Sequence, residues 1–400
     1  MIFISSDPLF SFPFSRCTSL YLIKLKTLST AILCILRHLV EILQLITRIA
    51  SDINKILYKM QDFKEIQYKD HGFVKEIILN NPKKFNILSL NMMDEMIALL
   101  NYLEKEISPS LVIIKGMGDH FCSGGNLFEV IQPQGGPKYV ANFAKIITSL
   151  KLSKKHTFLS LLKGFTIGSG LSLGIICHYS VATDTTLGGM PETKIGTSPN
   201  CALKFMEVPN FVGKYLWLSS ALLTGEDLVK CKVITNYMER QNYDIFEDEV
   251  KKIKKIGELN PILEKYSKKL ESPWEPLEAV KTVYKHEKIE DIYRAAETLA
   301  NTDPRGKKLL SELNKVSPFA LKVSTELWNR ITKTSSYQEA LSLEVKACIV
   351  MTQIKDFHEG LQVLKKKKPV AQWQHKSIFD VPQEEVLRVF EPSQQFRGSL

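Results

Sequence analysis

Residues 115–126 read KGMGDHFCSGGN and follow directly on the apolar run Leu111-Val112-Ile113-Ile114. Such a run is typical of a buried strand. The adjacent glycines Gly124 and Gly125 permit backbone conformations that point N–H groups into a cleft, a geometry that suits an oxyanion. A glycine pair alone is more often a flexible turn. The segment therefore predicts either an anion-binding loop at the end of a buried strand or a plain connection.

A second glycine-bearing turn lies at residues 163–170 and reads KGFTIGSG. The residues after it, through about Cys177, predict a helix whose first amides carry partial positive charge. The spacing of Gly168, Gly170 and Gly174 misses the dinucleotide-binding pattern by one residue, which argues against a nucleotide loop.

The third segment that could carry catalytic residues is Gly189–Gly196, which reads GMPETKIG. Here the carboxylate of Glu192 lies among apolar residues and glycines. Desolvation in such surroundings would make it a base or a nucleophile. A single glutamate is more often simply solvated. A catalytic role for Glu192 is therefore supported only in combination with the other two segments.

The chain around these turns alternates between strand and helix patterns. Residues 61–80 predict a hairpin, and the residues from Leu90 predict a helix. Further strands are predicted at Phe158–Leu162 and Ser180–Ala182, which gives the rhythm of an α/β layered domain. Beyond about residue 205 the strand signals fade. Helical periodicity dominates there, with breaks between helices expected at Pro261, Pro273, Pro276 and Pro304.

The composition is that of an ordinary globular protein: 400 residues, 44% hydrophobic and 24% charged. The formal net charge of +10 favours anionic partners without choosing among phosphates, nucleic acid and acidic lipids. Seven cysteines are scattered with no CxxC pair, which argues against a disulfide framework and a zinc cluster. A reducing compartment is therefore expected.

The first fifty residues differ in composition from the rest. Basic residues outnumber acidic ones among many serines and aliphatic residues, as in a mitochondrial transit peptide. Apolar residues recur at helical spacing over residues 28–49, which predicts an amphipathic helix. Because Arg37, His38 and Glu41 interrupt that stripe, no transmembrane span is expected. Residues 1–60 are therefore predicted to be a targeting or amphipathic extension, or else a helix packed on the domain.

The three segments, in this order and at these separations, resemble the crotonase superfamily and within it the 3-hydroxyisobutyryl-CoA hydrolase family. The resemblance covers about residues 62–390 and is carried by residues 78–92 (ILNNPKKFNILSLNM), Phe121–Gly125, Met190–Thr193, Val316–Pro318, Asp356–Gly360 and Trp373. The late DFHEG motif separates this family from plain hydratases. The resemblance implies an α/β fold, with a crotonase-like ββα spiral core at residues 61–240 and a mostly helical C-terminal region at residues 241–400.

The resemblance also implies roles for individual residues. The backbone N–H groups of Gly125 and Ser169 would polarise a thioester carbonyl, and Glu192 would act as nucleophile or water-activating base. The stretch Phe85-Asn86-Ile87 would line the adenine end of coenzyme A, with Lys83-Lys84 as phosphate partners. Those lysines are equally well explained as solvated surface charge. No metal or cofactor is implied, because the coenzyme A thioester is the substrate.

Several positions depart from the family pattern. The second acidic residue, expected eight positions after Glu192, is Asn200, whose amide cannot exchange a proton at neutral pH but can still orient a water. A Cβ at Ser169 is expected to restrict the backbone where a glycine is usual. The other departures are Cys201–Lys204 in place of a triple glycine, Asn126 in place of an aspartate and Lys163 in place of a histidine. Five departures around one site favour an impaired enzyme.

Two functions from different classes remain open. The first is a mitochondrial acyl-CoA thioester hydrolase of valine breakdown, acting on 3-hydroxyisobutyryl-CoA or a neighbouring acyl group. The second is a non-catalytic structural component of the small subunit of the mitochondrial ribosome, in contact with ribosomal RNA and proteins. It is favoured by the altered site, the net charge and four lysine runs: Lys251-Lys252, Lys254-Lys255, Lys307-Lys308 and Lys365–Lys368.

The lysine runs have a simpler explanation as solvated helix faces, because no aromatic residues or nucleic-acid motif accompany them. A hydratase or isomerase of the same superfamily is a weaker alternative. Ser172 and Asn200 offer no second carboxylate beside Glu192 for the acid–base pair that water addition needs. A homo-oligomer is a further expectation that the sequence leaves open.

Overall fold

The computed structural model describes residues 37–39, 41–43 and 63–391. The chain divides into two units, residues 1–61 and residues 62–400. In the first unit the described residues are helical and their side chains are exposed. The rest of the helix predicted at residues 28–49, and most of the targeting extension predicted at residues 1–60, lie outside the described residues. Among the described residues, no helix combines the length and the apolar character needed to cross a bilayer.

The second unit contains a six-stranded sheet. In spatial order its strands are β1 (Ile66–Asp70), β2 (Val74–Leu79), β3 (Leu111–Gly116), β4 (Thr157–Leu162), β6 (Tyr179–Thr183) and β9 (Asn236–Met238). The β1–β2 pair is antiparallel, which confirms the predicted hairpin, and the remaining pairs are parallel. All six residues of β2 are buried, as expected of a strand in a sheet covered on both faces.

A second sheet has three short strands, β5 (Phe165–Ile167), β7 (Leu187–Gly189) and β8 (Leu222–Thr224). β5 and β7 are parallel, and β7 and β8 are antiparallel. The sequence analysis placed no strands beyond about residue 205, so β8 and β9 correct it. Each has only three residues, which is too short to show an alternating pattern.

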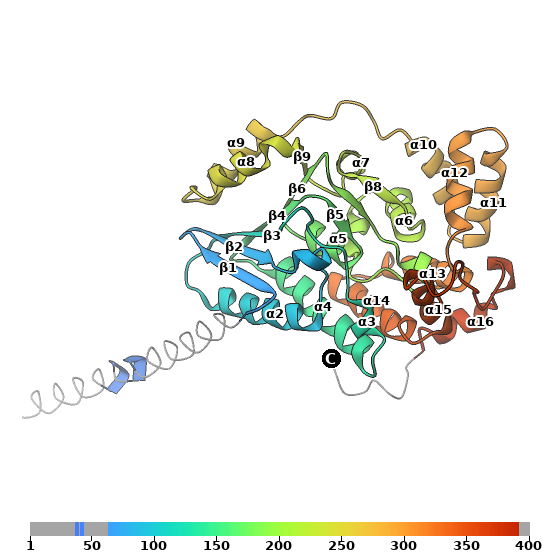
Figure 1. Ribbon diagram of the computed structural model, residues 1–400, viewed down its shortest axis with the longest axis horizontal. Helices are drawn as coiled ribbons and strands as arrows, with labels where there is room; N and C mark the ends of the chain where they lie inside the picture. Colours follow the sequence, from blue (N-terminus) through green and yellow to red (C-terminus); the bar gives the residue numbers. More distant parts are fainter. Residues whose placement is uncertain (1–36, 40, 44–62, 392–400) are drawn as a thin grey trace, which may run out of the picture. The chain divides into compact units, whose positions relative to one another are not determined.

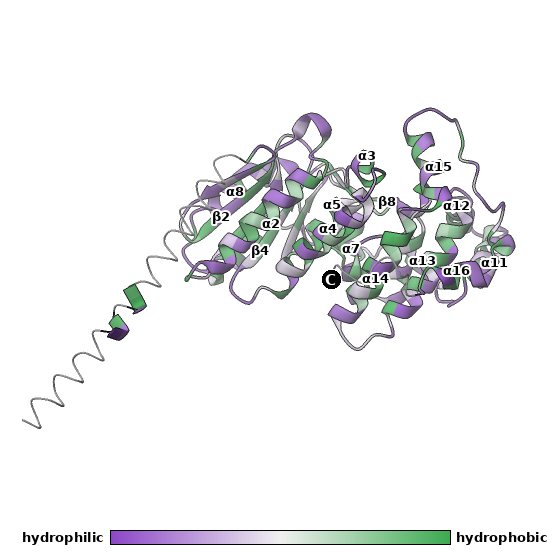
Figure 2. Cartoon of the chain, turned by 90° about the horizontal axis from the view of Figure 1, so that it is seen from below, coloured by the Kyte–Doolittle hydropathy of each residue, from purple (hydrophilic) through white to green (hydrophobic). Residues whose placement is uncertain are grey.

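Helices cover both faces of the large sheet. In Figure 1, α2 (Leu90–Lys105) and α4 (Gly135–Leu152) lie below β1 to β4, whereas α8 (Tyr243–Val250) and α9 (Leu259–Tyr266) lie above. The predicted start of α2 is confirmed, because Ser89 Oγ caps it by accepting the N–H of Met92 at 2.9 Å. Figure 2 shows hydrophilic and hydrophobic residues along α2 and α4.

The core above the sheet joins alternate strand residues to α8 and α9. Leu111, Ile113, Leu159 and Leu161 pack with apolar residues of both helices. The break predicted at Pro261 is wrong, because this proline is the third residue of α9. A proline in the first turn of a helix removes no intrahelical hydrogen bond, so α9 accommodates it.

The C-terminal region is mostly helical, as predicted. Besides α8 and α9, its helices are α10 (Leu277–Tyr284), α11 (Ile289–Ala300), α12 (Pro304–Leu313), α13 (Pro318–Ile331), α14 (Tyr337–Met351), α15 (Lys355–Leu364) and α16 (Gln383–Arg388). Two helices, α6 (Asn210–Leu218) and α7 (Gly225–Lys230), precede it. The remaining helices are α3 (Leu127–Val130) and α5 (Ser169–Ile175), and the 3-10 turns include η2 (Glu192–Ile195) and η3 (Leu203–Glu207). α11 and α12 pack side by side (Figure 1). The division of this unit at residues 240 and 241 stays a prediction.

Candidate functional site

Glu192 opens the short helix η2, directly after Pro191. Its Oε1 lies against the backbone of Gly168, where an added Cβ would come within 2.8 Å of that oxygen. Its Oε2 is buried and has no hydrogen-bond partner among the described residues. Burial raises the pKa of Glu192 to about 8, although its own backbone N–H opposes the shift. A buried carboxyl group with an unused oxygen and raised basicity suits a base or a nucleophile.

The two loops predicted to carry N–H donors run side by side. Ile167 donates its N–H to the carbonyl of Cys122 at 3.0 Å, and an added Cβ at Gly124 would lie 3.0 Å from the carbonyl oxygen of Ile167. Within the described part of the chain, the N–H groups of Gly125 and Ser169 form no hydrogen bond. Ser169 is the first residue of α5, so its amide has no intrahelical partner. The structure thus brings two unused amides together near Glu192.

Tyr139 of α4 contacts the two residues that carry the unused amides, Gly125 and Ser169, and the sequence analysis missed it. Its hydroxyl group donates to Ser169 Oγ at 3.0 Å, and an added Cβ at Gly125 would approach that hydroxyl to 2.3 Å. Ser169 has no positive φ, because the preceding Gly168 takes φ +56° instead. Ser169 therefore has a backbone conformation that any residue can adopt, and the expected restriction on the approach of a thioester stays a prediction.

Asn200 lies between η2 and η3 and is buried. Its Oδ1 accepts a hydrogen bond from Cys201 Sγ at 3.2 Å, and its carbonyl oxygen accepts one from Ser172 Oγ at 3.0 Å. The neighbouring carbonyl of Pro199 accepts from Cys348 Sγ of α14 at 3.1 Å. The position predicted for a proton-exchanging acid is therefore occupied by an amide that is held in place from several elements.

A second buried carboxyl group interacts electrostatically with Glu192, and the sequence analysis missed it. Glu344 of α14 is fully buried, and its Oε1 accepts the N–H of Ala202 at 3.0 Å. Burial raises the pKa of Glu344 to about 8, the N–H groups of Ala202 and Cys201 oppose the shift, and the charge of Glu192 adds to it. The one sequence signal was that Glu344 follows Leu341 by three residues and precedes Cys348 by four, on the apolar side of a helix.

The late DFHEG motif packs on η2. An added Cβ at Gly360 would come within 2.4 Å of the carbonyl oxygen of Ile195, and one at Gly196 within 2.3 Å of the carbonyl oxygen of Asp356. Asp356 Oδ2 accepts from Ser317 Oγ at 2.5 Å, and Ser317 donates its own N–H to the carbonyl of Thr193 at 3.0 Å. The motif therefore fixes the backbone that carries Glu192.

The predicted coenzyme A segment adjoins the Gly125 loop, because Leu88 donates its N–H to the carbonyl of Gly124 at 2.8 Å. Lys83-Lys84 and Phe85 are exposed, and Ile87 is half-buried. Asn86 is fully buried, and its amide group bonds Asn81, Met117 and His120. Its side chain thus braces the loop, and the exposed residues that precede it, Lys83 to Phe85, are the ones free to meet a ligand.

These features are accompanied by a family match along most of the chain. The model of the enoyl-CoA hydratase/isomerase family matches residues 74–390, which include every segment described above. The chain belongs to this family. The predicted resemblance to the crotonase superfamily is therefore confirmed.

Two groups of family relatives are similar to this chain. The first includes 3-hydroxyisobutyryl-CoA hydrolase 1 of Arabidopsis thaliana, 26% identical over 83% of this chain and 93% of that protein. It also includes the mitochondrial 3-hydroxyisobutyryl-CoA hydrolase of Rattus norvegicus, 27% identical over 82% of this chain and 88% of that protein. The second is represented by small ribosomal subunit protein mS47 of Neurospora crassa, 26% identical over 77% of this chain and 67% of that protein.

Solved structures of the family confirm the fold. A carnitinyl-CoA dehydratase from Mycobacterium thermoresistibile has a TM-score of 0.75 at 21% identity and covers 84% of this chain and 99% of its own. An enoyl-CoA hydratase from Rhodobacter sphaeroides has a TM-score of 0.73 at 22% identity, over 82% of this chain and 98% of its own. The predicted α/β crotonase fold with a helical C-terminal region is thus correct.

Two further departures from the family pattern have partners in other elements. Lys163 Nζ lies 5.0 Å from the ring centroid of Tyr243, in α8. Asn126 precedes α3 and donates its N–H to the carbonyl of Leu88 at 2.9 Å, without capping the helix through its side chain. The expectation that all five departures surround one site stays a prediction.

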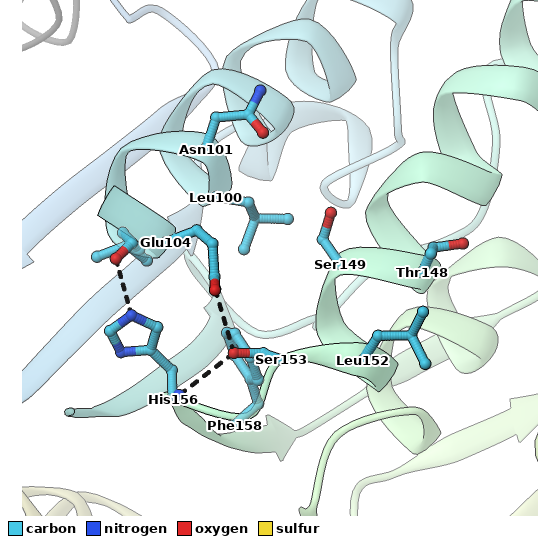
Figure 3. Close-up of a pocket in the computed structure, with 10 residues that line it drawn as sticks. Leu100, Asn101, Glu104, Thr148, Ser149, Leu152, Ser153, His156 and Phe158 are labelled. Carbon is cyan, nitrogen blue, oxygen red and sulfur yellow. Dashed lines mark hydrogen bonds between the residues drawn. The ribbon is translucent and has the colours of Figure 1, made fainter. Parts of the chain in front are cut away.

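A separate pocket of about 220 Å³ opens between α2, α4 and the start of β4 (Figure 3). His156, the titratable ring in it, has both nitrogens occupied, by Ser110 Oγ and by the carbonyl of Leu103, each at 2.8 Å. The pocket contains none of the predicted site residues. Nor do the described residues include a cluster of histidine, cysteine and acidic side chains that would hold a metal ion.

Proposed function

We propose that this chain is an acyl-CoA thioester hydrolase that acts on 3-hydroxyisobutyryl-CoA in mitochondria. The observation that carries the proposal is the unpartnered Oε2 of Glu192, next to the unused amides of Gly125 and Ser169. Support comes from relatives named as 3-hydroxyisobutyryl-CoA hydrolases. Those of Rattus norvegicus and Xenopus laevis are named as mitochondrial.

In the proposed reaction the thioester carbonyl oxygen accepts hydrogen bonds from the amides of Gly125 and Ser169. Glu192 then acts in one of two ways. As a base it takes a proton from water while the water oxygen attacks the carbonyl carbon, and as a nucleophile it attacks that carbon itself and forms an anhydride that water cleaves. In both, the C–S bond breaks, and the coenzyme A sulfur leaves with the electron pair and takes up a proton. The products are 3-hydroxyisobutyrate and coenzyme A.

The decisive experiment measures coenzyme A release from 3-hydroxyisobutyryl-CoA by the full chain and by Glu192→Gln. Glutamine keeps the size of the side chain but supplies no carboxylate, so the rate is expected to fall by a factor of about 10² to 10⁴. Glu312→Gln is a matched control, because Glu312 also has a buried unpartnered Oε2 and a pKa that burial raises to about 7, but it neighbours Tyr215 and not Glu192. Equal background rates in all three proteins would refute a hydrolase.

The second candidate is a non-catalytic component of the small mitochondrial ribosomal subunit. It is favoured by the similarity to mS47, by the amide at Asn200 and by the net charge of +10. Part of the lysine-rich surface already has internal partners, since Lys368 pairs with Glu359 at 2.8 Å and Lys251 with Asp248 at 2.8 Å. The exposed lysines of the runs that could face phosphates are Lys252, Lys254, Lys255, Lys307, Lys308, Lys366 and Lys367.

RNA binding distinguishes the two candidates. The ribosomal role predicts that the full chain binds ribosomal RNA with an affinity that falls steeply as salt increases, because bound phosphates release counterions. Glutamine substitutions at Lys254-Lys255 and Lys307-Lys308 would then reduce both the affinity and its salt dependence. An affinity too weak to measure at physiological salt would leave these lysines as solubilising surface charge.

A further inference from the structure

Glu192 and Glu344 form a pair of buried carboxyl groups contributed by distant parts of the chain. Each has an Oε2 atom that is buried and unpartnered among the described residues. They differ in accessibility, because Glu344 is fully buried whereas Glu192 as a residue is half-buried. Such a pair in a low-dielectric interior cannot easily carry two negative charges at once.

Glu344 is fixed to the loop that carries Asn200. Its Oε1 accepts the N–H of Ala202, and Cys348, one helical turn further along α14, donates to the carbonyl of Pro199. The buried face of α14 thus holds this loop from both sides of Asn200. Glu344 therefore occupies the side of the site where the acid expected at position 200 is absent.

The other titratable groups around the pair are neutral over the physiological range. Glu344 is fully buried and Glu192 is half-buried, so Glu344 is the carboxyl group that ionises second. The charge of Glu192 acts in the same direction, because it raises the pKa of Glu344 further. Burial raises the pKa values of the surrounding thiol and phenol groups above their ordinary ranges, so they titrate later still; these groups are Tyr139, Cys201, Tyr337 and Cys348.

We propose that Glu344 keeps its proton while Glu192 is ionised, and that it thereby supplies the second ionisable carboxyl group of the site, which position 200 lacks. Glu344 is a positioning residue: it acts through the Ala202 loop and through the charge state of the pair. The inference rests on the proposed hydrolase function for its effect on rate. The coupling between the two carboxyl groups does not depend on that function.

The proposal has a consequence for the dependence of rate on pH. With Glu344 protonated, a single negative charge on Glu192 faces the thioester. When Glu344 ionises at higher pH, a second negative charge appears close to where the oxyanion forms, which opposes its stabilisation. The rate therefore rises with pH as Glu192 ionises and falls again as Glu344 ionises.

The kinetic test compares pH profiles of kcat for coenzyme A release by the full chain and Glu344→Gln, from about pH 6 to about pH 10. The substituted glutamine can still accept the N–H of Ala202 but stays neutral, so the alkaline fall is expected to vanish or move up by more than about one pH unit. Glu312→Gln should retain the fall. A Glu344→Gln profile identical to that of the unchanged chain would overturn the proposal, because a purely structural role is insensitive to pH in this way.

A second test needs no activity. Denaturant midpoints of the unchanged chain, Glu192→Gln, Glu344→Gln and the double variant are measured at about pH 5 and about pH 9. The two substitutions are expected to be additive at the lower pH, where both groups are protonated, and non-additive at the higher pH, where both are charged. Additive shifts at both pH values would refute the pair even if the chain hydrolyses the thioester. A pH-dependent coupling in a chain without activity would refute the hydrolase and leave the pair.

Discussion

The two sides of the candidate site differ in how much close backbone packing holds them, although the Glu192 side also has a side-chain hydrogen bond, from Thr193 Oγ1 to the carbonyl of Leu218 at 2.9 Å. On the Glu192 side, η2 is fixed by close backbone packing, with Gly196 against Asp356 and Gly360 against Ile195. On the Asn200 side, the loop is fixed by hydrogen bonds from the side chains of three elements, through Ser172, Glu344 and Ser324, whose Oγ lies 3.0 Å from Ser198 Oγ.

This difference explains where the chain departs from the family pattern. A glycine whose Cβ would collide with a backbone carbonyl cannot be replaced without moving a strand or helix, so the Glu192 side admits little change. A loop held by side-chain hydrogen bonds can exchange one polar group for another of similar shape. The departures from the family pattern include Asn200 and Cys201–Lys204, which lie on the second side.

The largest effect is expected from a substitution that disrupts the packing of η2, on the Glu192 side. Gly360→Ala places a Cβ only 2.4 Å from the carbonyl oxygen of Ile195, which is closer than van der Waals contact allows. Either α15 or η2 must shift, and the free energy of unfolding is expected to fall by about 3 kcal/mol or more. Urea unfolding of the full chain measures the loss. Gly257→Ala is the matched control, because an added Cβ at Gly257 meets no atom within 4 Å. Equal stability of the two variants would contradict the role given to the late motif.

The next effect concerns the burial of Glu192 and its dependence on pH. Its pKa is raised from 4.5 to about 8 in the folded chain, so the folded state binds more protons than the unfolded state between these values. The free energy of unfolding should therefore fall as pH rises through this window, by on the order of 3 kcal/mol, and level off above it. Unfolding curves at several pH values would show a shallower fall in Glu192→Gln. An equally steep fall in that variant would mean that Glu192 is solvated.

The Glu192 side could be predicted from sequence, and much of the Asn200 side could not. Glycine turns and a carboxylate at fixed separations have local signatures, so the meeting of Gly125, Ser169 and Glu192 was expected. Glu344 lies more than 150 residues after Glu192, and in the sequence it is one of many acidic residues in a helical region. Only its place among apolar positions distinguishes it.

Tyr139 and the short strands were missed for related reasons. In the sequence, Tyr139 resembles any aromatic residue on the buried face of a helix. Its hydrogen bond to Ser169 exists because α5 packs near α4, and no local sequence pattern predicts that packing. β8 and β9 exist because neighbouring strands offer them pairing partners, and three residues carry too little periodicity to show it. Tertiary contacts therefore determine both the hydrogen bond of Tyr139 and the formation of β8 and β9.

A smaller effect sharpens the description of the Asn200 side. Ser172→Ala removes the hydrogen bond to the carbonyl of Asn200 and leaves that buried acceptor unpaired. The free energy of unfolding is expected to fall by about 1 to 2 kcal/mol. Thermal unfolding of Ser172→Ala beside Ser149→Ala, whose hydroxyl bonds only the exposed carbonyl of its own helix, measures the difference. Similar stabilities would show that side-chain hydrogen bonds do not hold this loop.

The smallest effect lies between the two sides, where Tyr139 meets Ser169. Tyr139→Phe and Ser169→Ala each remove one end of a 3.0 Å hydrogen bond in a buried place. A double-mutant cycle in urea should give a coupling of about 0.5 to 1.5 kcal/mol, because the second substitution costs little once the partner is gone. If the hydrogen bond also orients the amide of Ser169 toward substrate, both single variants and the double variant will lower kcat by the same factor. A coupling near zero would mean that Ser169 is held by α5 alone, and that the hydroxyl of Tyr139 serves only to fill the space behind Gly125.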